Sequence, residues 1–90
     1  MKTKKEVMDV LEANIEFANQ LLERWEYEKE YEDINDYRDA FEKRIGMKVH
    51  RVTKSPLLGF QVKAQGGIVI LKPKPQGNYI NWHFMFRPNK

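Results

Sequence analysis

The spacing of apolar residues changes once along this chain, near residue 46. Before that point apolar residues recur every three or four positions, which is the spacing of helices that pack on a core. After it they alternate with polar residues, which is the period of strands. The chain has 90 residues and no cysteine, so neither a disulfide nor a cysteine-bound zinc ion can hold it together. The two patterns therefore have to share one hydrophobic core.

This order of patterns predicts an α+β fold in a single domain, residues 1–90. We expect two N-terminal helices, in an acidic half that spans residues 1–46, to pack on one face of an antiparallel meander. The meander occupies the basic half, residues 47–90, and contains three or four strands.

The first helix is expected to begin after Thr3 and to continue on propensity to about Tyr31. Thr3 and Glu6 have the spacing of a capping box. The apolar stripe of this helix consists of Val7, Leu11, Ile15, Ala18, Leu22 and Trp25, widened by Val10, Phe17 and Leu21. A stripe this broad indicates more than one neighbour, either the second helix and the sheet or another subunit. The second helix is expected to start at Asn35 or Asp36 and to end at Gly46.

The expected strands are residues 48–53, 58–65, 68–72 and 79–87. The first is expected to end at Ser55-Pro56, and Pro73 and Pro75 to prevent regular pairing after the third. Gly77-Asn78 should then turn the chain into the last strand. In that strand Ile80, Trp82, Phe84 and Phe86 share one face. Such a row is typical of a core rather than of a platform on which single-stranded bases stack.

Gly66-Gly67 is expected to form a two-residue hairpin turn. The cross-strand pairs would then be Gln65 with Ile68, Lys63 with Ile70, and Gln61 with Lys72. One face of the sheet would be apolar and covered by the helices: Phe60, Val62, Ala64, Val69 and Leu71, beside the aromatic row of the last strand. The opposite face would carry Gln61, Lys63, Gln65, Ile68, Ile70, Lys72, Asn81, His83, Met85 and Arg87.

Charge divides between the two halves of the chain. Residues 1–45 hold all 13 Asp and Glu with 8 Lys and Arg, a net charge of −5, whereas residues 46–90 hold 8 Lys and Arg and no carboxylate. Two explanations compete. Either the halves neutralise each other, within the chain or between subunits, or the basic half faces a polyanion.

The polyanion hypothesis predicts a small nucleic-acid-binding protein, of the phage or mobile-element type, that uses the basic sheet face. The expected contact residues are Gln61, Lys63, Lys72, Lys74, Asn81, His83 and Arg87, with Lys72 to Lys74 in a proline-stiffened loop. Lysine and arginine would neutralise phosphates, amides would contact bases or sugars, and His83 would stack on a base. RNA and DNA are both partners consistent with this pattern. The sequence has no RRM signature, GxxG loop or zinc-finger spacing that would specify the mode.

A second hypothesis is a protein-interaction module or inhibitor that acts through the first helix and an acidic, tyrosine-rich stretch. The contact residues would be Glu26, Tyr27, Glu30 and Tyr31. A homodimer through the broad stripe of the first helix is compatible with both hypotheses. The longest apolar run, residues 68–71, is too short to span a bilayer, so no membrane contact is expected and the cytoplasm is the expected location.

Catalytic signals are sparse. His50 and His83 are the only imidazoles, and neither has a carboxylate beside it in the sequence. No catalytic residue, metal site or cofactor is therefore predicted. The order of elements nevertheless resembles small ribosome-dependent endoribonuclease toxins of the RelE-like class. That resemblance implies metal-free RNA cleavage, with His83 and Arg87 as candidates and Lys63 nearby; the chain departs from the class because no strand is evident before the helices.

Overall fold

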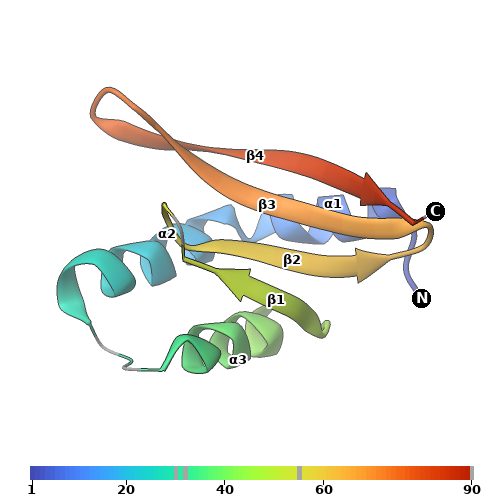
Figure 1. The fold of residues 1–90 in the computed structure, drawn as a ribbon, viewed down its shortest axis with the longest axis horizontal. Helices are drawn as coiled ribbons and strands as arrows, with labels where there is room; N and C mark the ends of the chain where they lie inside the picture. Colours follow the sequence, from blue (N-terminus) through green and yellow to red (C-terminus); the bar gives the residue numbers. More distant parts are fainter. Residues whose placement is uncertain (30, 32, 55, 90) are drawn as a thin grey trace.

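The fold was described from a computed structural model, which covers residues 1–29, 31, 33–54 and 56–89. In these residues three α-helices and a π-helical segment precede a four-stranded antiparallel sheet, so the expected α+β class is confirmed (Figure 1). The elements are α1 (Lys4–Ala13), α2 (Ile15–Glu23), the π-helical segment (Arg24–Glu28), α3 (Ile34–Ile45), β1 (Val49–Thr53), β2 (Gly59–Ala64), β3 (Gly67–Gln76) and β4 (Tyr79–Pro88).

The first expected helix is interrupted at Asn14. Its capping box is present, because the Thr3 hydroxyl accepts the Glu6 N–H while the Glu6 carboxylate accepts the Thr3 N–H. At Asn14 the side-chain amide donates to the carbonyl of Val10 over 2.8 Å. An amide that bonds to the carbonyl four residues earlier competes with the backbone ladder and bends a helix. Continuity from Thr3 to Tyr31 was therefore a wrong prediction, and two shorter helices cover the sheet instead.

The connection to α3 also differs from expectation. The π-helical segment ends at Glu28, and Lys29 has a left-handed backbone with φ 52°. Asp33, rather than Asn35 or Asp36, is the N-cap of α3, because its carboxylate accepts the backbone N–H of Asn35. The C-terminal prediction is confirmed, since Gly46 ends α3 with φ 71°.

The strands follow one another in the order β1-β2-β3-β4, as expected for a meander. The predicted pairs between β2 and β3 are wrong by two residues: Lys63 lies opposite Ile68, and Ala64 opposite Gly67. Gln65 and Gly66 form the turn, with a positive φ at Gly66 alone. Because the error is two residues and side chains alternate with period two, every predicted residue of these two strands except Gln65 stays on its predicted face. Gln65 leaves the face and joins the turn.

Two further corrections concern the edges of the sheet. β3 continues through Pro73 and Pro75, which pair with Trp82 and Ile80 of β4. Beyond Lys72 it has β4 as its only strand neighbour in the described part of the chain. A proline fits such an edge when its nitrogen faces away from the partner. The Lys72–Lys74 segment is therefore strand and not loop.

A bulge interrupts β1 at His50. Val49 pairs with Val62, and the next pair is Arg51 with Gln61, so His50 is the extra residue. The bulge lets Val49 and Val52 both pack against the core, which simple alternation would not allow. β1 ends at Thr53, and its predicted stop at Ser55 lies outside the described residues.

The core lies between the helices and one face of the sheet. Phe41 of α3 stacks on Phe60 of β2 with ring centroids 4.0 Å apart, and α1 packs against β2 and β3. Trp82 is buried and its indole N–H donates to the side-chain oxygen of Asn19 on α2. The aromatic row of β4 is thus part of the core, as expected, and not a stacking platform. Within the described ranges no helix is long and apolar enough to cross a membrane.

Candidate nucleic-acid interface

The face of the sheet turned away from the helices carries the side chains that alternate with the core residues. We call it the open face. Its residues include Arg51 of β1, Gln61 and Lys63 of β2, Ile68, Ile70, Lys72 and Lys74 of β3, and Asn81, His83, Met85 and Arg87 of β4. All seven residues predicted to contact nucleic acid belong to this face.

Strand pairing arranges the open face in transverse rows. Lys63 and Arg87 flank Ile68 in one row, and Arg51, Gln61, Ile70 and Met85 form the next. Farther along the β3–β4 ribbon, Lys72 lies opposite His83 and Lys74 opposite Asn81. The cations therefore surround a short apolar strip made of Ile68, Ile70 and Met85. Met85 is 48% exposed although it is a large apolar side chain.

Gln61 has a different position from the other predicted contact residues. It is only 9% exposed, and its side-chain oxygen accepts a hydrogen bond from Nη2 of Arg87 over 3.4 Å. The bond crosses from β4 to β2 and fixes one edge of an exposed guanidinium group, which has five N–H donors in all. Gln61 is thus placed to orient Arg87, while Asn81 is the exposed amide of the open face.

The described carboxylates lie on the helical layer. Every Asp and Glu precedes residue 43, so the open face contains none. In the described parts of the chain, the two ion pairs, Lys5 with Asp9 and Arg38 with Asp39, lie on the helices, and no carboxylate pairs with a sheet lysine or arginine. Lys4 lies over the ring of Phe86 at 4.7 Å, on the core side of β4. Internal neutralisation by direct ion pairs is therefore not seen for the described cations of the sheet.

Arg51 was missed as a site residue. Its strand gave a recognisable alternation, but the bulge at His50 changes which residues of β1 face which way. The position of Arg51 opposite Gln61 places a fifth cation on the open face. Arg51 could have been considered from the sequence, because it is one of the lysine and arginine residues that follow residue 46.

The two histidines do not share a site. His83 lies on the open face, and His50 lines a cleft at the start of β1. Among the residues described, no three His, Asp or Glu side chains converge as metal ligands would. His83 and Arg87 share a face as the RelE-like resemblance implies, with Met85 between them; the described residues before α1 form no strand. RNA cleavage stays a prediction.

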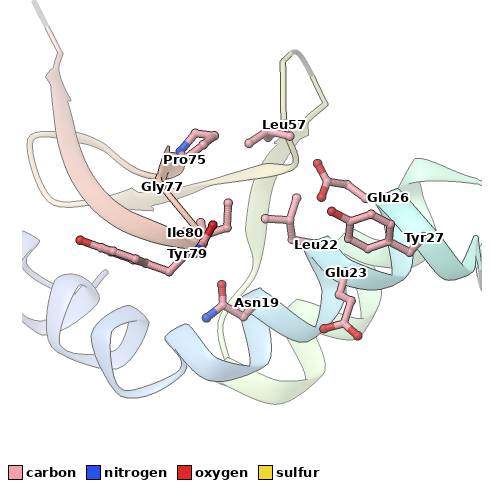
Figure 2. A pocket seen from close by; sticks show the side chains of 11 residues that line it. Asn19, Leu22, Glu23, Glu26, Tyr27, Leu57, Pro75, Gly77, Tyr79 and Ile80 are labelled. Carbon is pink, nitrogen blue, oxygen red and sulfur yellow. The ribbon is translucent and has the colours of Figure 1, made fainter.

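The acidic, tyrosine-rich stretch is divided in the structure. Glu26 and Tyr27 line a cleft of about 660 Å³ between the π-helical segment and the β3–β4 ribbon (Figure 2). Tyr31 instead packs edge-on against Tyr37, with ring centroids 5.0 Å apart, and Glu30 lies outside the described residues. Of the three described residues of this predicted set, Glu26 and Tyr27 line the cleft and Tyr31 does not. Tyr27 is 77% exposed at the rim of the cleft, which Glu23 also lines.

The stripe expected to support a homodimer is used inside the chain. Val7 and Leu11 are fully buried on the sheet, and Phe17 stacks on Phe41 of α3 with centroids 6.4 Å apart. The breadth of the stripe therefore follows from contacts with both the sheet and α3. Self-association through the first helix stays a prediction.

Comparison with family models, with curated proteins and with solved structures finds no match to this chain. The residues and geometry described above are therefore the whole basis for a functional proposal.

Proposed function

We propose that this chain binds nucleic acid across the open face of its sheet. The observation that carries the proposal is the arrangement of five cations around an apolar strip on a face without carboxylates: Arg51, Lys63, Lys72, Lys74 and Arg87. Phosphates need such counter-charges, and the release of their counterions supplies much of the binding free energy.

The rows of the open face suggest how a strand would lie. Lys72 and Lys74 are neighbours on the same face of β3, so they can contact successive phosphates along the ribbon. Asn81 lies opposite Lys74, where its amide can bond to a base or sugar. The strip that includes Met85 offers an apolar surface to the face of a base. Gln61 orients Arg87 in this scheme and does not contact a base.

The proposal is tested by fluorescence anisotropy with labelled single-stranded RNA, single-stranded DNA and duplex DNA at several salt concentrations. If all five cations contact phosphates, log K should fall with log salt with a slope of about −3.5 for single strands and about −4.5 for duplex DNA. Neutralising Lys72 and Lys74 (Lys72→Gln with Lys74→Gln) should reduce the magnitude of the slope by about 1.4–1.8. Affinity at ~0.1 M salt should then fall roughly 25- to 60-fold.

The matched control removes the same charge from the helical layer, as Lys5→Gln with Lys29→Gln. Both lysines are exposed and neither belongs to the open face. This variant should bind within about twofold of the unchanged protein at ~0.1 M salt, because charges more than a Debye length away are screened. Equal losses in the two double variants would mean that net charge alone acts. Absent or salt-insensitive binding would reject the proposal.

A second candidate function is the binding of a basic protein segment in the cleft of Figure 2. The specific observation is that Glu23, Glu26 and the exposed Tyr27 line one concave site. Carboxylates there can pair with lysine or arginine, and a tyrosine ring contributes contact area. Titration with an arginine-rich peptide, followed by NMR, should shift signals of the cleft in the unchanged protein. The Glu23→Gln with Glu26→Gln variant should lose those shifts, and shifts confined to other surfaces would reject this function.

A further inference from the structure

A second cleft, of about 580 Å³, is lined by residues at the start of β1. β1 begins at the end of the sheet remote from the β3–β4 turn (Figure 1). We call this second cleft the cationic cleft. Its lining includes Lys2 of the N-terminal segment, Arg38 of α3, Lys48 before β1, His50 of β1 and Lys63 of β2. No carboxylate lines it among the residues that the structure describes. Four residues with a formal positive charge, from separate elements, therefore line one concave site.

The fold holds these elements together by specific contacts. The backbone N–H of Gln65 donates to the carbonyl of Lys2 over 2.8 Å, which ties the N-terminal segment to the β2–β3 turn. The backbone N–H of Val49 donates to the carboxylate of Glu42 over 2.9 Å, which fixes the start of β1 to α3. Val49 and Val62 are buried and contribute apolar atoms to the lining of the cleft.

Among the described residues, the one ion pair made by these four cations of the cleft is that of Arg38. Arg38 has Asp39 at 3.4 Å, but both side chains are substantially exposed, and such pairs contribute little. Like charges around one cleft repel one another, so a bound anion would relieve that repulsion. Arginine and lysine donors form their strongest hydrogen bonds with phosphate and carboxylate oxygens.

We propose that the cationic cleft binds a phosphate monoester. A monoester has close to two negative charges near neutral pH and three unesterified oxygens, so it can accept bonds from several elements at once. An internal phosphodiester has only one charge. Lys63 belongs to both the cleft and the open face. A nucleic-acid strand on the open face can therefore place its phosphorylated end in the cleft. A monoester from a strand end rests on the proposed nucleic-acid binding, whereas a monoester from a free phosphate compound does not.

The first experiment uses inorganic phosphate and pyrophosphate as probes and thermal unfolding as the measurement. Either anion should raise the Tm of the unchanged protein above its value in sodium chloride of equal ionic strength, because a ligand that binds the native state stabilises it. The variant Arg38→Gln with Lys48→Gln should lose that excess. The control Lys5→Gln with Lys29→Gln should keep it, which separates site binding from the general stabilising effect of phosphate salts.

The second experiment compares a single-stranded oligonucleotide with and without a terminal phosphate, at the 5′ end and at the 3′ end in turn. The unchanged protein should bind one phosphorylated form roughly tenfold more tightly, which is the effect of one charge-assisted hydrogen bond. Arg38→Gln with Lys48→Gln should remove this preference and still bind the unphosphorylated strand. Heteronuclear NMR should place the difference at the cleft, including the amide of His50.

The outcomes separate the two proposals. Stabilisation by phosphate with equal binding of all strand ends assigns the cleft to a small phosphate compound and supports the site. Stabilisation by phosphate without any strand binding rejects the nucleic-acid function and leaves the cleft standing. Equal stabilisation of the Arg38/Lys48 variant and the control, or none in the unchanged protein, would overturn the cationic cleft as a phosphate site.

Discussion

Replacing Gly67 by alanine is expected to destabilise the protein more than the same change at the neighbouring turn glycine, Gly66. A Cβ atom at Gly67 would lie 2.8 Å from the ring of Phe86 and 2.8 Å from Cα of Pro88, and closer still to the carbonyl oxygen of Arg87. Two of these neighbours are backbone atoms of β4. The strands would therefore have to move apart where Gly67 pairs with Pro88.

The magnitude follows from two opposing effects. An extra carbon in a closely packed site costs about 1–3 kcal/mol, and backbone neighbours that cannot rotate away place Gly67 at the upper end. Alanine also restricts the conformations of the unfolded chain, which raises the free energy of unfolding by about 0.4–1 kcal/mol. The net loss for Gly67→Ala is then about 2 kcal/mol. A Cβ atom at Gly66 would have no neighbour within 4 Å. The cost there is the strain of a left-handed backbone at φ 82°, about 1–2 kcal/mol, from which the same effect on the unfolded chain is subtracted.

Equilibrium urea unfolding, followed by circular dichroism, measures both variants. A loss of 2 kcal/mol corresponds to a fall in Tm of about 8–16 °C for a protein of this size. Gly66→Asn is the matched control, because asparagine adopts the left-handed conformation more easily, and it should be milder than Gly66→Ala. If Gly67→Ala unfolds like the unchanged protein while Gly66→Ala is the more damaging, the close approach of β3 and β4 and the register derived from it are wrong.

Three further changes test the fold that presents the open face and the cationic cleft. Phe41→Ala should cost about 3–5 kcal/mol in urea unfolding, because the ring is fully buried and stacks on Phe60, whereas Phe41→Leu should cost clearly less. Glu42→Ala should cost about 1–2 kcal/mol by leaving the N–H of Val49 without its acceptor, and Glu42→Gln should restore most of it. The backbone and hydroxyl of the N-cap residue of α1 hold the pKa of Glu6 below its usual value, so its contribution to stability is complete above the ordinary carboxyl pKa and is lost as pH falls through the lowered one. Glu6→Gln should accordingly weaken the acid-side dependence of Tm, and an unchanged Tm–pH curve would contradict this.

The faces of the sheet could be predicted from sequence because they depend on period two alone. The exact pairs could not, because Gly66 and Gly67 are chemically identical. Only their surroundings separate them: Gly66 has the positive φ, and Gly67 has β4 against it. The strand through Pro73 and Pro75 could not be predicted either. It depends on where β2 begins, because β2 starts at Gly59 and leaves β3 beyond Lys72 without a neighbour on that side in the described part of the chain.

The candidate site divides in the same way. The open face follows from alternation within single strands, so its seven predicted residues could be named in advance. The cationic cleft joins Lys2, Arg38, Lys48 and Lys63, which are far apart in sequence and meet only through the packing of α3 and the N-terminal segment. No local pattern contains that information. The helix break at Asn14 is partly predictable from the sequence. A hydrogen bond within the helix causes it, but asparagine also occurs inside unbroken helices.

The layered fold has a consequence for the salt dependence of binding. The two halves of the sequence differ in charge, and the fold places them in two layers. The described carboxylates lie on the helical layer and five cations lie on the open face. The shortest dimension of the molecule is 23 Å. The Debye length is ~8 Å at physiological ionic strength, so a polyanion on the open face is largely screened from the carboxylates, but it is ~30 Å at 0.01 M.

We therefore expect the plot of log K against log salt to be linear near 0.1 M and to flatten toward 0.01 M, as repulsion from the helical layer reaches the ligand. Charge neutralisation of Glu12 and Glu16, both exposed on the helices, should remove much of the flattening without changing binding near 0.1 M. A plot that stays linear to 0.01 M would show that the acidic layer does not act on the bound strand.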